Sequence, residues 1–155
     1  MLKFYNFDIV FQEIPDETTF AVNLTNCPNH CPDCHSSHLW KDIGTPLNEE
    51  SIQALLAPYI GAITCFCFMG GDAAPADVNR MACFLRAHYP RLKIAWYSGR
   101  TEMAPQAEYC NFDFIKFGPY RKEVGSLKSP TTNQRLYEIL PTGEKQDITS
   151  KFWKH

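Results

Sequence analysis

Three cysteines, Cys27, Cys31 and Cys34, form the pattern C-x3-C-x2-C within residues 25–35. Iron–sulfur clusters are held by cysteine thiolates, and a cluster of four irons and four sulfides usually takes four of them. Three thiolates in one short loop would leave one iron open to a ligand from outside the protein. The spacing therefore predicts a cluster that takes part in chemistry.

The same loop allows a second interpretation. His35 or His38 could complete a Cys3His set, which is a common structural zinc site, and the chain would then be a binding module without catalysis. His30 and His35 could also hydrogen-bond to cluster sulfur or be plain loop residues. Trp40 could cover the loop or pack as an ordinary aromatic residue.

Length and composition set limits on the function. The chain has 155 residues, of which 45% are apolar and 21% charged, so we expect one globular domain over residues 1–155. A net charge of −2 disfavours nucleic acid as a partner, and no apolar run is long enough to span a membrane. Residues 1–8 do not resemble a secretion signal, which predicts a cytoplasmic protein. The cytoplasm keeps most thiols reduced, and the chain has an odd count of seven cysteines, which favours metal ligation over disulfides.

Strands alternate with helices along the chain, which is typical of an α/β fold. We expect strands over residues 18–24, 63–69, 92–97 and 112–117, and a terminal β-hairpin built from 135–140 and 146–149. We expect one helix after Asn48, continuing through Tyr59 and Ile60, one from Pro75, and a short one over 102–109. Residues 4–11 could add one more strand.

Four unusual segments follow the expected strands: 27–34, 70–72, 98–100 and 116–119. Ligands of α/β proteins gather at the carboxyl ends of parallel strands, so these segments predict one shared site. Taken alone, Gly70-Gly71-Asp72 could equally be a turn between a strand and a helix.

These motifs resemble those of the radical S-adenosylmethionine (SAM) enzymes, which carry C-x3-C-x2-C after the first barrel strand and a Gly-Gly-acid motif after the second. Further segments resemble one family among them, the activating proteins of anaerobic ribonucleoside-triphosphate reductases; they are Cys31-Pro32-Asp33-Cys34-His35 with Trp40, Trp96-Tyr97-Ser98-Gly99, Gly118-Pro119-Tyr120 and Thr132-Asn133-Gln134-Arg135. The chain departs from the usual pattern at three places. Asp33 stands where an aromatic residue often precedes the third cysteine, and Asp72 stands where glutamate is more frequent. Lys116-Phe117 stands where many relatives have an acidic residue before Gly-Pro. The resemblance implies a partial (β/α) barrel of the radical SAM type with a C-terminal β-hairpin.

The resemblance also implies a mechanism. Cys27, Cys31 and Cys34 would hold three irons of a 4Fe-4S cluster, and the amine and carboxylate of SAM would chelate the fourth. An electron from a low-potential donor such as flavodoxin or ferredoxin would cleave the sulfonium to methionine and a 5'-deoxyadenosyl radical. That radical would take a hydrogen from a glycine near the C-terminus of the large reductase subunit, leaving a glycyl radical.

Six residues are expected to contact the cofactor: Gly70, Gly71, Asp72, Ser98, Gly99 and Lys116. Glycine lets the backbone approach the methionyl group, and Asp72 or its carbonyl can accept hydrogen bonds from the SAM ammonium. Ser98 offers a hydroxyl and Gly99 open backbone. Lys116 could pair with the SAM carboxylate or ribose region, or extend into solvent.

Other residues are interpreted more simply. Cys65, Cys67, Cys83 and Cys110 are expected to be buried in the core as small apolar residues. Four basic residues could receive the reductase tail or form a solvated loop: Arg121, Lys122, Lys128 and Arg135. A radical SAM enzyme acting on a small molecule is the alternative within the same superfamily, although the short chain disfavours the extra strands that it would need.

Overall fold

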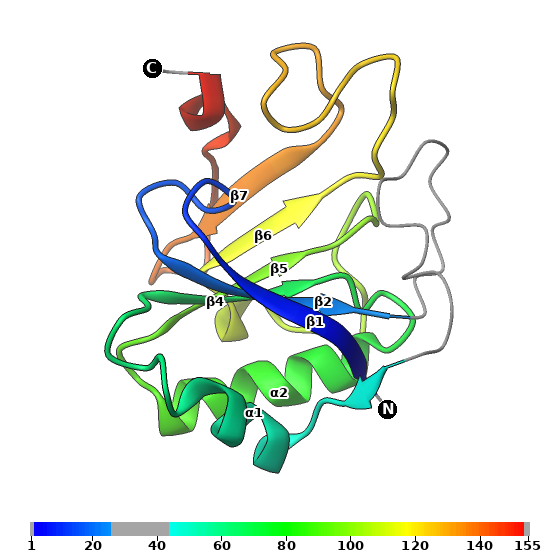
Figure 1. The fold of residues 1–155 in the computed structure, drawn as a ribbon. Helices are drawn as coiled ribbons and strands as arrows, with labels where there is room; N and C mark the ends of the chain where they lie inside the picture. The colour runs from blue at the N-terminus through cyan, green and yellow to red at the C-terminus, as the bar shows by residue number, and fades with distance from the viewer. Residues whose placement is uncertain (1, 26–43, 154–155) are drawn as a thin grey trace.

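The computed structural model describes residues 2–25 and 44–153, which form one mixed sheet with two α-helices, an α/β architecture (Figure 1). The strands are β1 (Lys3–Val10), β2 (Thr19–Leu24), β3 (Thr45–Pro46), β4 (Cys65–Met69), β5 (Lys93–Tyr97), β6 (Phe114–Phe117), β7 (Arg135–Ile139) and β8 (Lys145–Asp147). The helices are α1 (Glu49–Leu56) and α2 (Pro75–His88), with short 3-10 helices η2 (Tyr109–Asn111) and η3 (Thr149–Trp153).

The strands follow the order β3-β1-β2-β4-β5-β6-β7-β8 across the sheet. The central strands β2, β4, β5 and β6 are parallel, while β1, β7 and β8 pair antiparallel at the two sides. The predicted terminal hairpin is therefore present as β7 and β8, with Ile139 opposite Lys145. The segment 4–11 supplies β1. The carboxyl ends of the four parallel strands consequently lie along one edge of the sheet.

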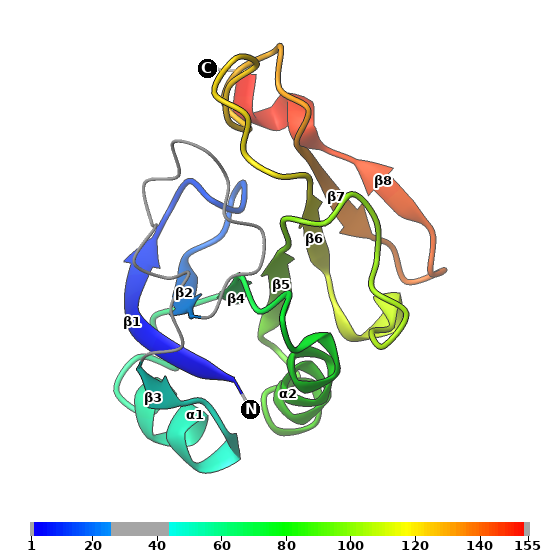
Figure 2. The ribbon, with the colours of Figure 1, turned by 90° about the vertical axis from the view of Figure 1, so that its right-hand side faces the viewer.

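Both α-helices cover the same face of the sheet, as Figure 2 shows from the side. The core on this face joins alternate residues of the central strands, among them Phe20, Val22, Leu24, Phe66, Phe68, Ile94, Trp96 and Ile115, to the helices. The opposite face has its own buried cluster: Ile14, Ala21, Cys65, Cys67, Ala95, Phe114, Leu127, Leu136 and Ile148. Because β4 is buried on both faces, its sequence is almost continuously apolar, as predicted.

Helix α1 begins where the sequence predicts and ends earlier. The Asn48 side chain accepts from the Ser51 amide at 2.9 Å, and the Ser51 hydroxyl accepts from the Asn48 amide at 2.8 Å, which forms a capping box. The helix ends at Leu56, so Tyr59 and Ile60 lie in the following turns and not in the helix. Pro58 accounts for this difference, because it has no amide hydrogen to continue the helical pattern.

The predicted helix over residues 102–109 is wrong. Turns and irregular chain make up this segment as far as Glu108, and the 3-10 helix η2 begins at Tyr109. Pro105 lacks an amide hydrogen and disfavours helical backbone at Ala104. Only two small side chains of the segment, Ala104 and Ala107, are buried, so no apolar stripe compensates.

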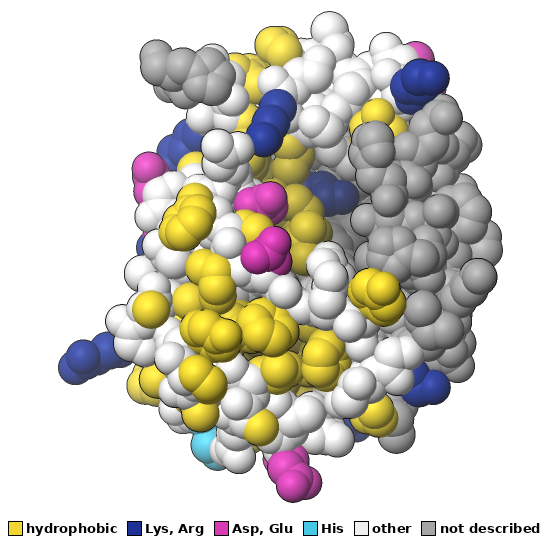
Figure 3. All heavy atoms as spheres, viewed as in Figure 1, with side chains coloured by type: hydrophobic (Ala, Val, Ile, Leu, Met, Phe, Trp, Pro, Cys, Tyr) yellow, Lys and Arg dark blue, Asp and Glu magenta, His cyan; other side chains and the backbone are white. Residues whose placement is uncertain are grey.

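The surface of the described residues carries apolar side chains over the lower half of the face in Figure 3, where α1 and the lower end of β1 lie in Figure 1. Three large apolar side chains stand out as exposed: Tyr5, Phe11 and Ile60. Within residues 2–25 and 44–153, neither α1 nor α2 has the length and apolar character that crossing a membrane requires.

Candidate functional site

Three of the four predicted segments meet at the carboxyl edge of the parallel strands. The chain after β4 contacts the end of β5, since the amide of Gly70 donates to the Tyr97 carbonyl at 3.0 Å. The chain after β5 contacts β6, since the amide of Ser98 donates to the Lys116 carbonyl at 2.9 Å. The fourth segment, 27–34, lies outside the described residues.

Asp72 joins the first two segments through its side chain. The carboxylate is 3% exposed and accepts from the Ser98 hydroxyl at 2.6 Å and from the Gly99 amide at 2.8 Å. The Asp72 carbonyl accepts from the Arg100 guanidinium at 3.3 Å. Hydrogen bonds to an ionised acceptor are the stronger kind, so this carboxylate fixes the backbone that leaves β5. Asp72, Ser98 and Gly99 therefore form one hydrogen-bonded unit, in which the carboxylate has a structural task beside any contact to a ligand.

The two glycines that precede Asp72 differ in their surroundings. Both have positive φ, 101° at Gly70 and 91° at Gly71, which side chains rarely adopt. A Cβ on Gly71 would lie 2.7 Å from a methyl of Val78 and 2.8 Å from a methyl of Leu24, so packing against α2 excludes a side chain there. Among the residues that the structure describes, a Cβ on Gly70 would have no neighbour closer than 3.7 Å. Gly70 is thus the position of the two at which a ligand could approach the backbone.

Lys116 is buried on the sheet face that the helices do not cover. Its side chain is 8% exposed, its ammonium donates to the Gly118 carbonyl at 3.1 Å, and it lies 5.5 Å from the centre of the Tyr97 ring. The sequence left open whether Lys116 extends into solvent, and the structure places it inside. A buried ammonium stabilised by a carbonyl and an aromatic face is a cation held in place beside the edge.

A pocket of about 260 Å³ opens beside this lysine. Its walls come from several separate parts of the chain: Gln12, Glu13, Tyr97, Lys116, Tyr120, Ser126, Leu127, Lys128, Gln134 and Phe152. A larger pocket of about 330 Å³ lies elsewhere, around Ile60 and residues 89–92, and has Arg91 as its one ionisable side chain besides Tyr89. The smaller pocket combines buried charge with polar groups, and we therefore take it as part of the candidate site.

The segment 11–17 closes one side of this pocket and was not identified from the sequence. Ile14 is fully buried in the cluster on the uncovered face of the sheet. The Tyr97 hydroxyl donates to the Glu13 carbonyl, and the Lys128 ammonium donates to the Gln12 side chain at 2.8 Å. Burial raises the pKa of the Tyr97 phenol well above its ordinary value, so the hydroxyl keeps its proton and remains a donor.

Gln134 is a second residue to which sequence reasoning gave no role. It is 6% exposed, and its side-chain amide donates to the Gly118 carbonyl at 3.3 Å, the same oxygen that accepts from Lys116. Glutamine is mostly exposed in proteins, so the residue type gave no signal that Gln134 is buried. The three basic residues Arg121, Lys122 and Lys128 are exposed, and Arg135 is half-buried.

The remaining cysteines divide into two pairs. Cys65 and Cys67 are fully buried, as predicted, and burial raises the pKa of both thiols, so they stay protonated and are poor metal ligands. Cys83 and Cys110 are exposed, and the expectation that they belong to the core is wrong. Helical spacing explains Cys83, because the buried stripe of α2 (Val78, Met81, Ala82, Leu85) lies on another side of the helix.

The predicted cluster ligands Cys27, Cys31 and Cys34 and the neighbouring residues His30, His35, His38 and Trp40 lie outside the described residues. Within residues 2–25 and 44–153, no three side chains of His, Cys, Asp or Glu come together as a metal site.

Comparison with known proteins gave no relative. No protein-family model matches the chain, and no curated protein and no solved structure matches it significantly. The resemblance to radical SAM enzymes consequently rests on the motifs of the chain itself.

Proposed function

We propose that this chain is a radical SAM activating enzyme that generates a glycyl radical on an anaerobic ribonucleoside-triphosphate reductase. The observation that carries the proposal is the meeting of segments 70–72, 98–100 and 116–118 at one edge of the sheet. β2 is parallel to β4 and ends at the same edge, and C-x3-C-x2-C begins three residues after Leu24. A cluster loop, a glycine-containing turn and a buried cation would then share one site.

The described residues fit SAM in three respects. Gly70 leaves space beside its backbone, and the ammonium of Lys116 is buried next to a pocket. Asp72 connects the segments that follow β4 and β5 by a hydrogen bond to Ser98. We assign the methionyl end of SAM to the side of Gly70 and its carboxylate to Lys116, since a buried ammonium attracts a carboxylate strongly. Gly71, Ser98 and Gly99 build the turn that positions these groups.

The three thiolates with SAM supply reductive cleavage of the sulfonium when cluster and cofactor are bound. The protein supplies placement and exclusion of water. The segment 11–17, fixed by Ile14 and by the Tyr97–Glu13 hydrogen bond, closes the uncovered face of the sheet and leaves the carboxyl edge as the approach for a substrate.

We assign the sheet to the partial (β/α) barrel type. The parallel strands β2, β4, β5 and β6, with α1 and α2 on one face, support this assignment. The crossover from β5 to β6 contains only the 3-10 helix η2, so the chain is a reduced version of such a barrel. We place the protein in the cytoplasm, where a reducing environment preserves a thiolate-bound cluster.

A protein substrate is favoured over a small molecule by the small volume of the pocket. The pocket of about 260 Å³ leaves little room for a small-molecule substrate beside a cofactor, and the exposed Lys128 belongs to its wall. A glycine in a peptide loop has no side chain to accommodate. The large reductase subunit, presenting its C-terminal glycine region, has this chemistry.

The test is electron paramagnetic resonance spectroscopy of the large reductase subunit after anaerobic incubation with this protein, SAM and reduced flavodoxin or ferredoxin. We expect a glycyl radical signal that is absent when SAM is omitted and when the C-terminal glycine of the reductase subunit is replaced by alanine. Cleavage of SAM without a reductase radical would favour the small-molecule enzyme. Stoichiometric zinc without any iron cluster would favour the binding module.

A further inference from the structure

Two exposed thiols, Cys83 in α2 and Cys110 in η2, play no part in the proposed activity. Both elements lie away from the carboxyl edge, at the side where the chain enters β6. Exposed free thiols on elements that pack against each other can serve as a modification site if the two sulfur atoms face each other.

The contacts of α2 place its residue 83 opposite residue 110. One turn before Cys83, the Asn79 side chain accepts from the Glu108 amide at 3.0 Å and from the Asn111 side chain at 2.8 Å. Almost one turn after Cys83, the Arg86 guanidinium donates to the Cys110 carbonyl at 3.3 Å.

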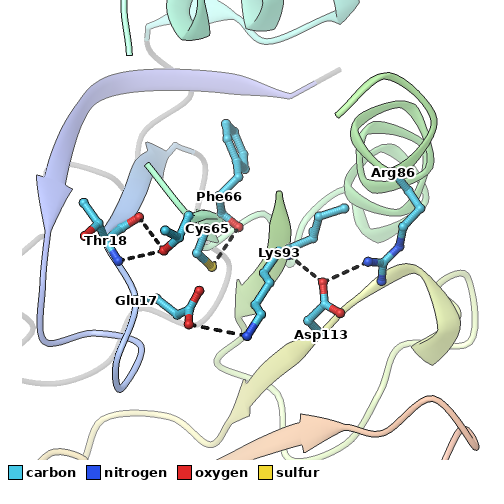
Figure 4. A network of polar contacts seen from close by, with 9 residues as sticks. Glu17, Thr18, Cys65, Phe66, Arg86, Lys93 and Asp113 are labelled. Atoms are coloured by element: carbon cyan, nitrogen blue, oxygen red, sulfur yellow. Dashed lines mark hydrogen bonds and ion pairs between the residues drawn. The ribbon is translucent and has the colours of Figure 1, made fainter. Parts of the chain in front are cut away.

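Arg86 also reaches Asp113 at 2.9 Å, and Figure 4 shows this side chain extending from α2 to the start of β6. Positions 79, 83 and 86 are spaced four and three residues apart and therefore share one side of the helix. Cys83 lies between two contacts to the segment 108–113, and Cys110 lies at the middle of that segment.

The charges around Cys83 agree with this placement. Partial burial raises the pKa of the Cys83 thiol, and the neighbouring Cys110 and Glu108 raise it further. Cys110 is therefore close enough for its charge to act on Cys83. The Cys110 thiol itself lies 3.7 Å from a carboxylate oxygen of Glu108.

We propose that Cys83 and Cys110 are a redox-responsive pair that forms a disulfide with low-molecular-weight disulfides such as oxidised glutathione. The Cys110 thiolate attacks the disulfide, forms a mixed disulfide and releases one glutathione thiolate. The Cys83 thiolate then attacks the Cys110 sulfur and releases the second glutathione thiolate. The two protons lost by the cysteines go to the two released thiolates, so two protein thiols are oxidised while one glutathione disulfide is reduced. We assign the first attack to Cys110 because the raised pKa of Cys83 lowers the fraction of that residue present as thiolate.

The bond would fasten α2 to the chain that enters β6. Asp113 in this segment accepts from the Ile94 amide at 2.8 Å and precedes β6, the strand that ends near Lys116. Closing the loop from 83 to 110 should raise the melting temperature of the oxidised protein by roughly 5–10 °C. The disulfide would thus stabilise the fold under oxidising conditions.

The experiment uses the reduced full-length chain, equilibrated anaerobically with mixtures of reduced and oxidised glutathione and then alkylated. Tryptic digestion without reductant should yield peptides 81–86 and 101–116 joined by a disulfide, which reductant separates. The variant C27S/C31S/C34S should form the same joined peptides, because the pair does not depend on the triad.

The variants C83S and C110S are the controls. Each should lose the joined peptides and the rise in melting temperature, and keep the far-ultraviolet circular dichroism of the parent, because both positions are exposed. Recovery of Cys83 and Cys110 as free thiols, as separate glutathione adducts, or joined only to other cysteines would overturn the proposal.

Discussion

Replacing Asp72 by alanine tests whether its carboxylate fixes the exits of β4 and β5. The substitution removes the acceptor of two donors, the Ser98 hydroxyl at 2.6 Å and the Gly99 amide at 2.8 Å, at a side chain that is 3% exposed. Each buried donor left without an acceptor costs about 1–3 kcal/mol, so we expect a loss of roughly 2–5 kcal/mol in the free energy of unfolding. Asp72→Asn keeps one acceptor oxygen and should lose only about 1 kcal/mol.

Equilibrium unfolding in urea measures these changes, and a double-mutant cycle with Ser98→Ala isolates the pair. We expect a coupling of about 1.5–3 kcal/mol between the two positions, because the hydrogen bond has a charged acceptor. Asp77→Ala is the matched control, since the Arg80 side chain that pairs with it at 2.6 Å is 67% exposed and the ion pair should be worth less than about 1 kcal/mol. Additive effects in the cycle, or equal losses for Asp72→Ala and the control, would refute this reasoning.

Three further predictions concern the same edge and the sheet behind it. Gly71→Ala should destabilise the fold by about 1–3 kcal/mol more than Gly143→Ala, because both have positive φ but only Gly71 is crowded; equal losses in thermal unfolding would contradict this. Burial raises the pKa of Cys67, so the native state keeps a proton that the unfolded chain loses, and stability falls as the pH rises above about 8.5. Cys67→Ala should lessen this fall by up to about 1.4 kcal/mol per pH unit in urea titrations, and an unchanged slope would count against a buried thiol. Lys116→Met should raise the SAM concentration for half-maximal cleavage about tenfold or more, whereas Lys128→Met, an exposed residue of the same pocket, should change it little.

Much of the fold could be predicted because local signals agree with the tertiary structure. Asn48 caps α1 and Pro75 opens α2 as their residue types predict, and the apolar run of β4 indicates a strand covered on both faces. The convergence of the strand exits followed from parallel pairing alone. The premature end of α1 and the irregular segment 102–109 each trace to a proline whose effect outweighed a weak helical pattern.

Other features depend on contacts between distant parts of the chain, and no local pattern carries them. The burial of Lys116 depends on Tyr97 in the neighbouring strand and on the segment 11–17, which folds over the sheet and buries Ile14. The exposure of Cys83 could have been predicted from the sequence, because the spacing of the apolar residues in α2 already excludes it from the buried stripe. The expectation that it is buried relied on residue type where periodicity was the better guide.

Formation of 5'-deoxyadenosine tests the proposed function most directly. The protein is reconstituted anaerobically with iron and sulfide, reduced in the presence of SAM, and the nucleoside is quantified by chromatography beside a Cys27→Ala variant. We predict 5'-deoxyadenosine from the parent protein and none from Cys27→Ala, with the fold of the variant intact by circular dichroism. Equal amounts from both proteins, or bound zinc in place of a cluster, would contradict the assignment of C-x3-C-x2-C as the ligands of a catalytic iron–sulfur centre.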